Sequence, residues 1–183
     1  MTACAKRASA MLVALLLLGT AANADTLIMT LDNVQTGDCD TPWTEGVCDL
    51  QVVDTAIGDY TPPGNCIWFP QAEGLALFGA RLEIDTTALT GLETVEVDLR
   101  EVSGDGRTRI FLFEEGATNY FQFVMSTYDG GATDQTLPLF TAGFEVGKIA
   151  ISGHEALITE VRLIGNLIVG NEAETWSVLK TRW

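Results

Sequence analysis

The sequence has few basic residues. Its 10 Lys and Arg stand against 25 Asp and Glu, and with a single histidine the formal net charge at pH 7 is −15. A surface this acidic repels nucleic acids and anionic lipids, so we expect no binding to DNA, RNA or a membrane surface. Cations, neutral sugars and proteins remain as partners, although the simplest role of such a charge is to keep the protein in solution.

Several motifs that carry chemistry are also absent. No C-x-x-C occurs, which excludes a thioredoxin-like redox site and a zinc ribbon, and no C-x-x-C-H occurs for covalent haem attachment. A lone histidine, His154, argues against a multi-histidine zinc or copper centre. Without a G-x-S-x-G elbow, Ser152 beside His154 is better explained as a surface turn than as part of a catalytic triad.

No long segment has the helical period, and short alternating runs separated by Gly, Asp, Thr and Pro fill the chain after residue 24. The clearest run is 94–102, where Val95, Val97 and Leu99 point one way and the charged residues between them point the other. Residues 110–113 are apolar on both faces, which predicts a central, covered strand. The pattern predicts an all-β fold, an antiparallel two-sheet β-sandwich.

The first 24 residues predict a secretory signal peptide. Lys6 and Arg7 precede an apolar run over 10–18, and the small-residue site 22–24 follows it. The run is short for an uncleaved membrane anchor. Cleavage there would remove two basic residues and no acidic ones, leaving residues 25–183 as a single domain that is secreted, periplasmic or on the outer cell surface.

Three cysteines remain after cleavage, so one is left over from any pairing. Cys39 and Cys48 bracket a short segment that contains Pro42 and Gly46, and this is the pairing we favour. Closing so short a loop stabilises by about 2 to 3 kcal/mol on the chain-entropy model. Cys66 would then be free or available to another subunit, and the other two pairings remain open.

Three motifs follow one another between residues 75 and 165: a strand at 82–85, the L-T-G-L turn and alternating strand at 89–98, and the I-S-G strand end at 149–153. In this order they resemble the galactose-binding-like jelly roll of exported bacterial proteins. This resemblance implies a jelly-roll sandwich that binds carbohydrate at edge loops or on a sheet face, frequently with a structural calcium. The C-terminal sorting tail that some members carry is not found in residues 166–183.

One sequence within the clearest strand suggests an enzyme. Glu96, Asp98 and Glu101 form an E-x-D-x-x-E motif that resembles the catalytic strand of laminarinase-type retaining glycoside hydrolases. That resemblance implies a nucleophile at Glu96, an assisting Asp98 and an acid/base at Glu101. Two such carboxyls must lie about 5 to 5.5 Å apart on one face. Glu101 shares a face with the other two only if a bulge adds a residue to the strand, and the same carboxylates also fit the wet face of an ordinary strand.

Two further groups are candidate binding sites. A calcium ion, the one cofactor we consider, would suit the loop carboxylates Asp38 and Asp40 or Asp129 and Asp134, which otherwise are solvated turn residues. Aromatic residues near Gly/Pro-rich loops would provide a sugar-stacking platform or else cap the core. These aromatics are Trp43, Tyr60, Trp68 and Phe69.

Together these features predict an exported, non-catalytic binding or cell-surface protein whose favoured ligand is carbohydrate. The alternatives are a retaining glycoside hydrolase that uses the E-x-D-x-x-E strand, and a structural envelope or matrix protein that assembles through Cys66 or the C-terminal tail. Neither the ligand nor the oligomeric state follows from the sequence.

Overall fold

A computed structural model of the chain describes residues 24–31, 41–53, 68–71, 74–101, 108–126 and 134–170, with the backbone alone for 68–71, 154 and 155. These residues form antiparallel strands joined by turns. The strands are β1 (Asp25–Met29), β2 (Trp43–Glu45), β3 (Cys48–Val53), β4 (Trp68–Gln71), β5 (Gly74–Asp85), β6 (Leu89–Glu101), β7 (Arg109–Phe113), β8 (Gln122–Met125), β9 (Asp134–Phe140) and β10 (Lys148–Val169).

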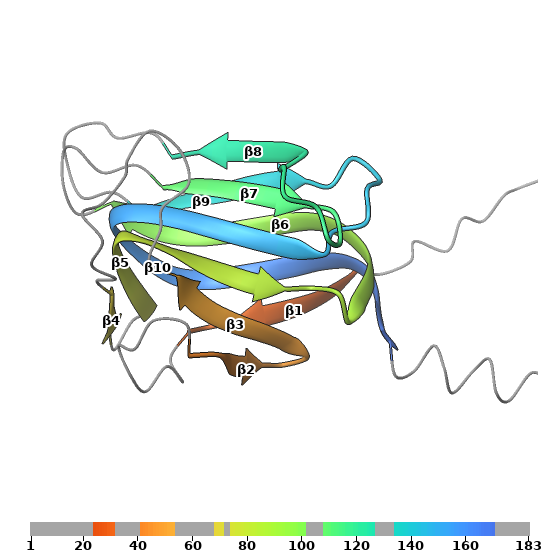
Figure 1. The fold of residues 1–183 in the computed structure, drawn as a ribbon, viewed down its shortest axis with the longest axis horizontal. Coiled ribbons are helices and arrows are strands. Elements are labelled where there is room, and N and C mark those ends of the chain that lie inside the picture. Colours follow the sequence, from red (N-terminus) through yellow and green to blue (C-terminus); the bar gives the residue numbers. More distant parts are fainter. Residues whose placement is uncertain are drawn as a thin grey trace, which may run out of the picture.

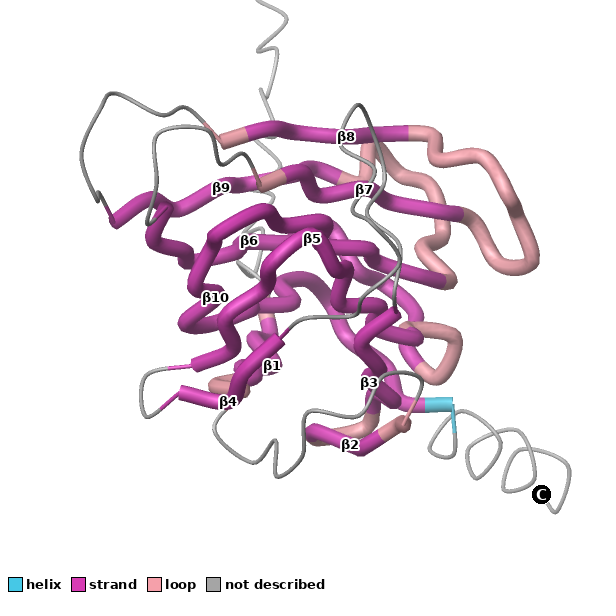
Figure 2. The backbone as a smooth tube through the Cα atoms, turned by 60° about the vertical axis from the view of Figure 1, so that its left-hand side comes forward, coloured by secondary structure: helices cyan, strands magenta, loops and turns pink. Residues whose placement is uncertain are grey.

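Two layers arise because the long strands β5 and β10 bend and pass from one layer to the other. The first part of β10 pairs with β5 and β7, whereas its later part pairs with β1 and β6. The front sheet in Figure 1 therefore runs β2-β3-β5-β10-β7-β8. In the back sheet β9 pairs with β6 and β6 with β10, and the other edge of β10 pairs with β1 and with the first part of β5, which also pairs with β4. Figure 2 shows the same two layers with β8 and β7 at one edge of the molecule and β2 at the other.

The bend is marked by breaks in the regular strand register. On β10 the register shifts on both sides of His154, which pairs with Phe78 of β5. Next to Phe78, Gly79 has a φ of 79°, a conformation that glycine adopts without a steric penalty. The prediction of a surface turn at Ser152 and His154 was wrong. The polar residues 152–155 lie within one continuous strand at its bend.

The core lies between the two sheets and consists of inward-facing residues in matching register. Val95, Val97 and Leu99 of β6 all face inward and are buried, as the alternation predicted. Burial of each such side chain stabilises the fold by about 1.5 to 3 kcal/mol before the entropy loss is counted. A row of core residues crosses the front sheet and consists of Leu50, Ile84, Ile149 and Leu112. A second row crosses the back sheet and consists of Met29, Val161, Val97 and Leu137. The predicted fold class, an all-β antiparallel two-sheet β-sandwich, is confirmed.

Some predictions fall outside this part of the chain. The signal peptide lies outside the described residues except for Ala24, and export stays a prediction. Within the described ranges, no helix has the length and apolar character needed to cross a membrane. Cys48 is buried, but Cys39 and Cys66 lie outside the described residues, so the Cys39–Cys48 bridge also stays a prediction.

Candidate functional site

The outer face of the front sheet combines an aromatic half with a polar half. Strand register places Gln51 of β3, Glu83 of β5, Ala150 of β10 and Phe111 of β7 in one row, with Phe123 of β8 at its end. A parallel row runs from Asp49 through Asp85 and Lys148 to Phe113. Polar side chains therefore come from β3 and β5, and aromatic side chains from β7 and β8.

Four rings form what we call the aromatic cluster, which consists of Phe111, Phe113, Tyr120 and Phe123. Tyr120 lies at the centre of the cluster, with ring-centroid distances of 4.9 Å to Phe111, 6.4 Å to Phe113 and 5.6 Å to Phe123. Phe111 and Phe113 are buried beneath it, whereas Tyr120 is 46% and Phe123 52% exposed. The cluster thus offers two rings to solvent on a fixed base of two others.

Strand alternation explains why these rings lie outside the core. In β7, Ile110 and Leu112 point into the main core, so Phe111 and Phe113 must point outward. There they pack with Ala150 of β10 as a separate small apolar cluster. The predicted covered strand at 110–113 is thus buried on both faces, with the exposed rings of Tyr120 and Phe123 providing its outer cover.

A hollow of about 410 Å³ lies over the polar half of the face. Its floor includes Asp49, Gln51, Glu83 and Asp85, and the turn after β7 contributes Glu114 to its rim. Such a hollow is within the size range of small-ligand sites.

Lys148 lies at the boundary between the hollow and the aromatic cluster. Its ammonium Nζ is 4.8 Å from the centroid of the Phe113 ring and 3.2 Å from Glu83 Oε1. Arg81 Nε is 2.8 Å from the same carboxylate oxygen, and Gln51 donates to Glu83 Oε2 at 3.3 Å. Burial opposes ionisation of Glu83, but hydrogen bonds and charge from Arg81 and Lys148 outweigh it and lower the pKa of Glu83. At neutral pH this carboxylate is charged and held in place.

The groups on this face can contact a sugar in two ways. Exposed rings pack against the apolar face of a pyranose, while nearby carboxylate, amide and ammonium groups hydrogen-bond to its hydroxyls. Gln51, Glu83 and Lys148 supply both donors and acceptors in the hollow, and Lys148 also lies against Phe113 of the aromatic cluster.

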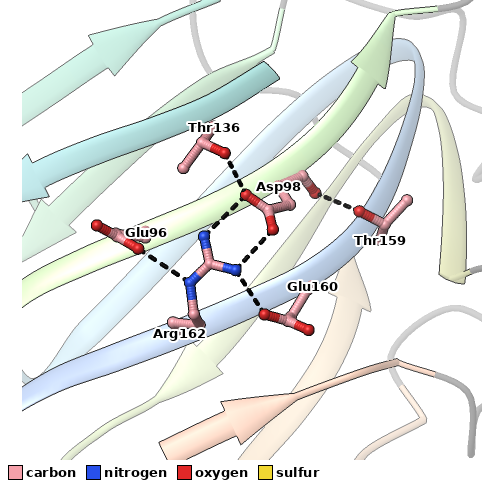
Figure 3. A network of polar contacts seen from close by, with 6 residues as sticks. All are labelled: Glu96, Asp98, Thr136, Thr159, Glu160 and Arg162. Atoms are coloured by element: carbon pink, nitrogen blue, oxygen red, sulfur yellow. Dashed lines mark hydrogen bonds and ion pairs between the residues drawn. The ribbon is translucent and has the colours of Figure 1, made fainter. Parts of the chain in front are cut away.

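The predicted catalytic carboxylates lie elsewhere, and two of them form a salt-bridge network on the outer face of the back sheet (Figure 3). Arg162 of β10 contacts Glu96 Oε2 at 2.9 Å, Asp98 Oδ2 at 2.6 Å and Glu160 Oε1 at 2.5 Å. Thr136 of β9 also donates to Asp98, at 2.6 Å. The hydrogen bond from Arg162 is the main cause of a lowered pKa at Asp98, and it likewise raises the pKa of Arg162.

Glu101, the third residue of the motif, points in the opposite direction. It is fully buried, accepts a hydrogen bond from the Thr108 backbone N–H at 2.9 Å and another from the Ser126 hydroxyl. The register between β6 and β10 shifts at this point, because Leu99 pairs with Ile158 and Asp98 pairs with Glu160. The unpaired residue is therefore Thr159 of β10, and β6 contains no bulge between Glu96 and Glu101. The three carboxylates do not share a face, and the hypothesised hydrolase site is not assembled.

The other predicted binding residues are only partly covered by the structure. Asp134 is exposed, and Arg100 Nε lies 2.7 Å from its Oδ1. Its predicted calcium partners Asp38, Asp40 and Asp129 lie outside the described residues. Among the residues described, no three His, Cys, Asp or Glu side chains are grouped to hold a metal.

The predicted aromatic platform has a similar outcome. Trp43 packs against the core, and its indole N–H donates to Glu45 Oε1 at 3.2 Å. Tyr60 lies outside the described residues, while Trp68 and Phe69 are described in backbone only, within β4. The platform stays a prediction, and sequence reasoning missed Tyr120 and Phe123. The signal was available, because a strand apolar on both faces needs an outer cover and these aromatic residues follow it directly in the chain.

No protein-family model and no curated protein matches the chain. Among solved structures, a mutant of CBM29-2, a family 29 carbohydrate-binding module, is similar over 81% of this chain and 91% of its own, with 13% identity and a TM-score of 0.39. A structure titled "CBM4 structure and function" aligns over 79% of this chain and 84% of its own, with 8% identity and a TM-score of 0.29. The enzymatically active domain of bacteriophage CBA120 tailspike protein 4 aligns over 81% of this chain and 19% of its own, with 9% identity and a TM-score of 0.28. All three TM-scores are low, and these similarities do not indicate a function for this chain.

Proposed function

We propose that this chain is an exported, non-catalytic glycan-binding protein, and that the aromatic cluster with the adjoining hollow is its binding face. The observation that carries the proposal is the exposure of Tyr120 and Phe123 on a rigid base beside a polar hollow. Exposed rings in this setting are typical of a ligand-contact surface, because covering their apolar surface with a ligand removes it from water, which is favourable.

The geometry also favours binding over hydrolysis. Glu83, a buried carboxylate of the face, is held ionised by Arg81 and Lys148, so it is unsuited to donate a proton as a general acid. The E-x-D-x-x-E carboxylates are divided between the outer surface and the core.

The experiment is a comparison of two aromatic substitutions by affinity electrophoresis and calorimetry. Tyr120→Ala and Phe123→Ala are each expected to weaken binding to the neutral polysaccharide that retards the wild type most, by about tenfold or about 1.4 kcal/mol. Phe140→Ala is the matched control, since Phe140 is 63% exposed but lies on β9 of the back sheet. Its affinity should equal that of the wild type.

Two results would contradict the proposal. One is an absence of retardation of the wild type across a panel of neutral β- and α-linked polysaccharides. The other is an equal loss of affinity in Phe140→Ala and Phe123→Ala, which would separate binding from the aromatic cluster. Thermal unfolding of each variant establishes that it is folded.

A further inference from the structure

Glu101 is the most deeply buried carboxylate among the residues that the structure describes. It occupies the inward-facing position of β6 that follows Leu99, so strand alternation alone turns it toward the core. Its Oε1 atom accepts hydrogen bonds from the Thr108 backbone N–H at 2.9 Å and from the Ser126 hydroxyl. Its Oε2 atom is buried as well, yet no donor among the described residues reaches it. One oxygen of a buried carboxylate is therefore left without a hydrogen bond.

The other two buried carboxylates differ from Glu101 in this respect. Glu45 accepts a hydrogen bond at each of its oxygens, from the Trp43 indole N–H and from the Leu31 backbone N–H. Glu83 also has donors at both oxygens, and two of them are basic side chains. None of the Lys or Arg side chains in the described ranges forms an ion pair with Glu101. A buried charge that lacks both a full set of hydrogen bonds and an opposite charge is strongly unfavourable.

A second unsatisfied oxygen belongs to a residue bonded to the first. Thr108 donates its backbone N–H to Glu101, and its own hydroxyl oxygen Oγ1 is buried without a partner. In the described part of the chain, these are the two buried side-chain polar atoms that lack a hydrogen bond. Buried polar atoms of native proteins rarely lack partners, and an exception commonly marks a bound water molecule or ion. Two exceptions on directly bonded residues indicate one bound species.

A cation suits these two atoms better than a water molecule. Water can hydrogen-bond to Oε2 of Glu101 and Oγ1 of Thr108, but it leaves the negative charge of the carboxylate uncompensated, whereas a cation also supplies the opposite charge. Carboxylate and hydroxyl oxygens are the ligands that Ca²⁺ and Mg²⁺ prefer. Mg²⁺ gives up its water reluctantly and usually keeps several water ligands, so the fully buried position of Glu101 favours Ca²⁺.

We propose that Glu101 Oε2 and Thr108 Oγ1 are ligands of a bound calcium ion that joins the two sheets. Glu101 ends β6 of the back sheet, whereas Thr108 precedes β7 and Ser126 follows β8 of the front sheet. The site is separate from the glycan-binding face, because Thr108 and the hollow lie at opposite ends of β7, a strand about 17 Å long. A single carboxylate with neutral oxygen ligands makes a weak site, with a Kd of about 0.1 to 1 mM.

The test is thermal unfolding of the protein after treatment with EDTA and buffer exchange, at about 0.15 M NaCl, where exposed charges more than about 8 Å apart are largely screened. Addition of about 10 mM CaCl2 should raise the unfolding midpoint by about 3 to 10 °C, as follows from the expected Kd and the size of the domain. The same concentration of MgCl2 should give less than about a third of that shift. In Glu101→Gln, which keeps the size of the side chain, the calcium shift should disappear.

Two further variants separate a calcium ligand from a structural role. Glu45→Gln also neutralises a buried carboxylate, but one whose two oxygens are both hydrogen-bonded, and it should keep the full calcium shift. Thr108→Val removes the unpartnered hydroxyl and keeps the backbone N–H bond to Glu101, so in EDTA it should be no less stable than the wild type. Its calcium Kd, measured by calorimetry, should nevertheless be about tenfold higher. This variant keeps the proposal testable if Glu101→Gln fails to fold.

Any of four results would overturn the proposal. An unfolding midpoint that does not change with calcium would mean that Glu101 and Thr108 hold water instead of an ion. Equal shifts with CaCl2 and MgCl2, or an equal calcium shift in Glu101→Gln and the wild type, would mean that divalent ions act on the acidic surface in general. A calcium Kd in Thr108→Val equal to that of the wild type would place the ion elsewhere. None of these results bears on glycan binding, which is tested with the aromatic variants.

Discussion

Arg162 holds three carboxylates together on the outer face of the back sheet. Replacing it with methionine keeps much of its packing volume but leaves Glu96, Asp98 and Glu160 to repel one another. The site is partly exposed, which weakens each ion pair, so we expect Arg162→Met to lower the free energy of unfolding by about 1 to 3 kcal/mol in urea at pH 7. Arg100→Met, which loses an ion pair to an exposed partner, should have a smaller effect.

The same substitution should change the acid sensitivity of the fold. Arg162 lowers the pKa of Asp98 in the folded state, so this carboxylate stabilises the protein fully above its unfolded pKa of about 3.9. That contribution is lost as the pH falls through the lower folded-state pKa. Arg162→Met removes the largest cause of the difference between the two states, so its unfolding free energy should fall less than that of the wild type between about pH 5 and about pH 2. Equal falls would show that Arg162 does not control this titration.

Among the strands, β6 and β10 approach each other closely at Gly91 of β6. A Cβ on Gly91, where φ is 76°, would lie 2.1 Å from the carbonyl oxygen of Asn166. Gly116, in the turn after β7, has a similar φ of 69° but no described atom within 4 Å of an added Cβ. Alanine at either position incurs a backbone strain of about 1 kcal/mol, so the difference between the two variants isolates the steric clash.

We therefore expect Gly91→Ala to be less stable than Gly116→Ala by about 2 kcal/mol or more, because the backbones of β6 and β10 must separate to admit the methyl group. Urea and thermal unfolding measure both variants under the same conditions. Equal stabilities would mean that the two strands can move apart without cost at this point.

The sequence predicts which side chains of a strand face the core where polar and apolar residues alternate. It does not predict where a strand bends and continues. Val95, Val97 and Leu99 follow the period of two along β6, and this local pattern alone predicted that they face the core. The bend of β10 involves Ser152 and Gly153, a polar pair that in the sequence is indistinguishable from a turn. Its continuity depends on hydrogen bonds to β5 and β7, which are distant in the chain.

For the molecule as a whole, the candidate site could be predicted less well than the fold. The pairing of Asp49 with Asp85 and the contact of Phe111 with Phe123 depend on which strands become neighbours, information that no local pattern contains. The catalytic interpretation of the E-x-D-x-x-E motif fails for a reason that is visible in the sequence. In a strand without a bulge, side chains alternate between faces, so Glu101 faces away from Glu96. A short motif on a strand therefore indicates catalysis only if its side chains lie on the same face of that strand.

The excess of 25 acidic over 10 basic residues affects the stability of the entire fold. Folding brings like charges together, and the resulting repulsion acts over about 30 Å at 0.01 M salt but only about 8 Å at 0.15 M. Acidic residues outnumber basic ones by more than two to one, so screening by salt weakens more repulsion than attraction in the folded protein. The free energy of unfolding should therefore rise when NaCl is increased over this range. Asp25→Asn/Glu145→Gln, which carries less negative charge, should show a smaller rise. A decrease with salt in the wild type would mean that local ion pairs, such as those of Arg162, outweigh the repulsion across the whole surface.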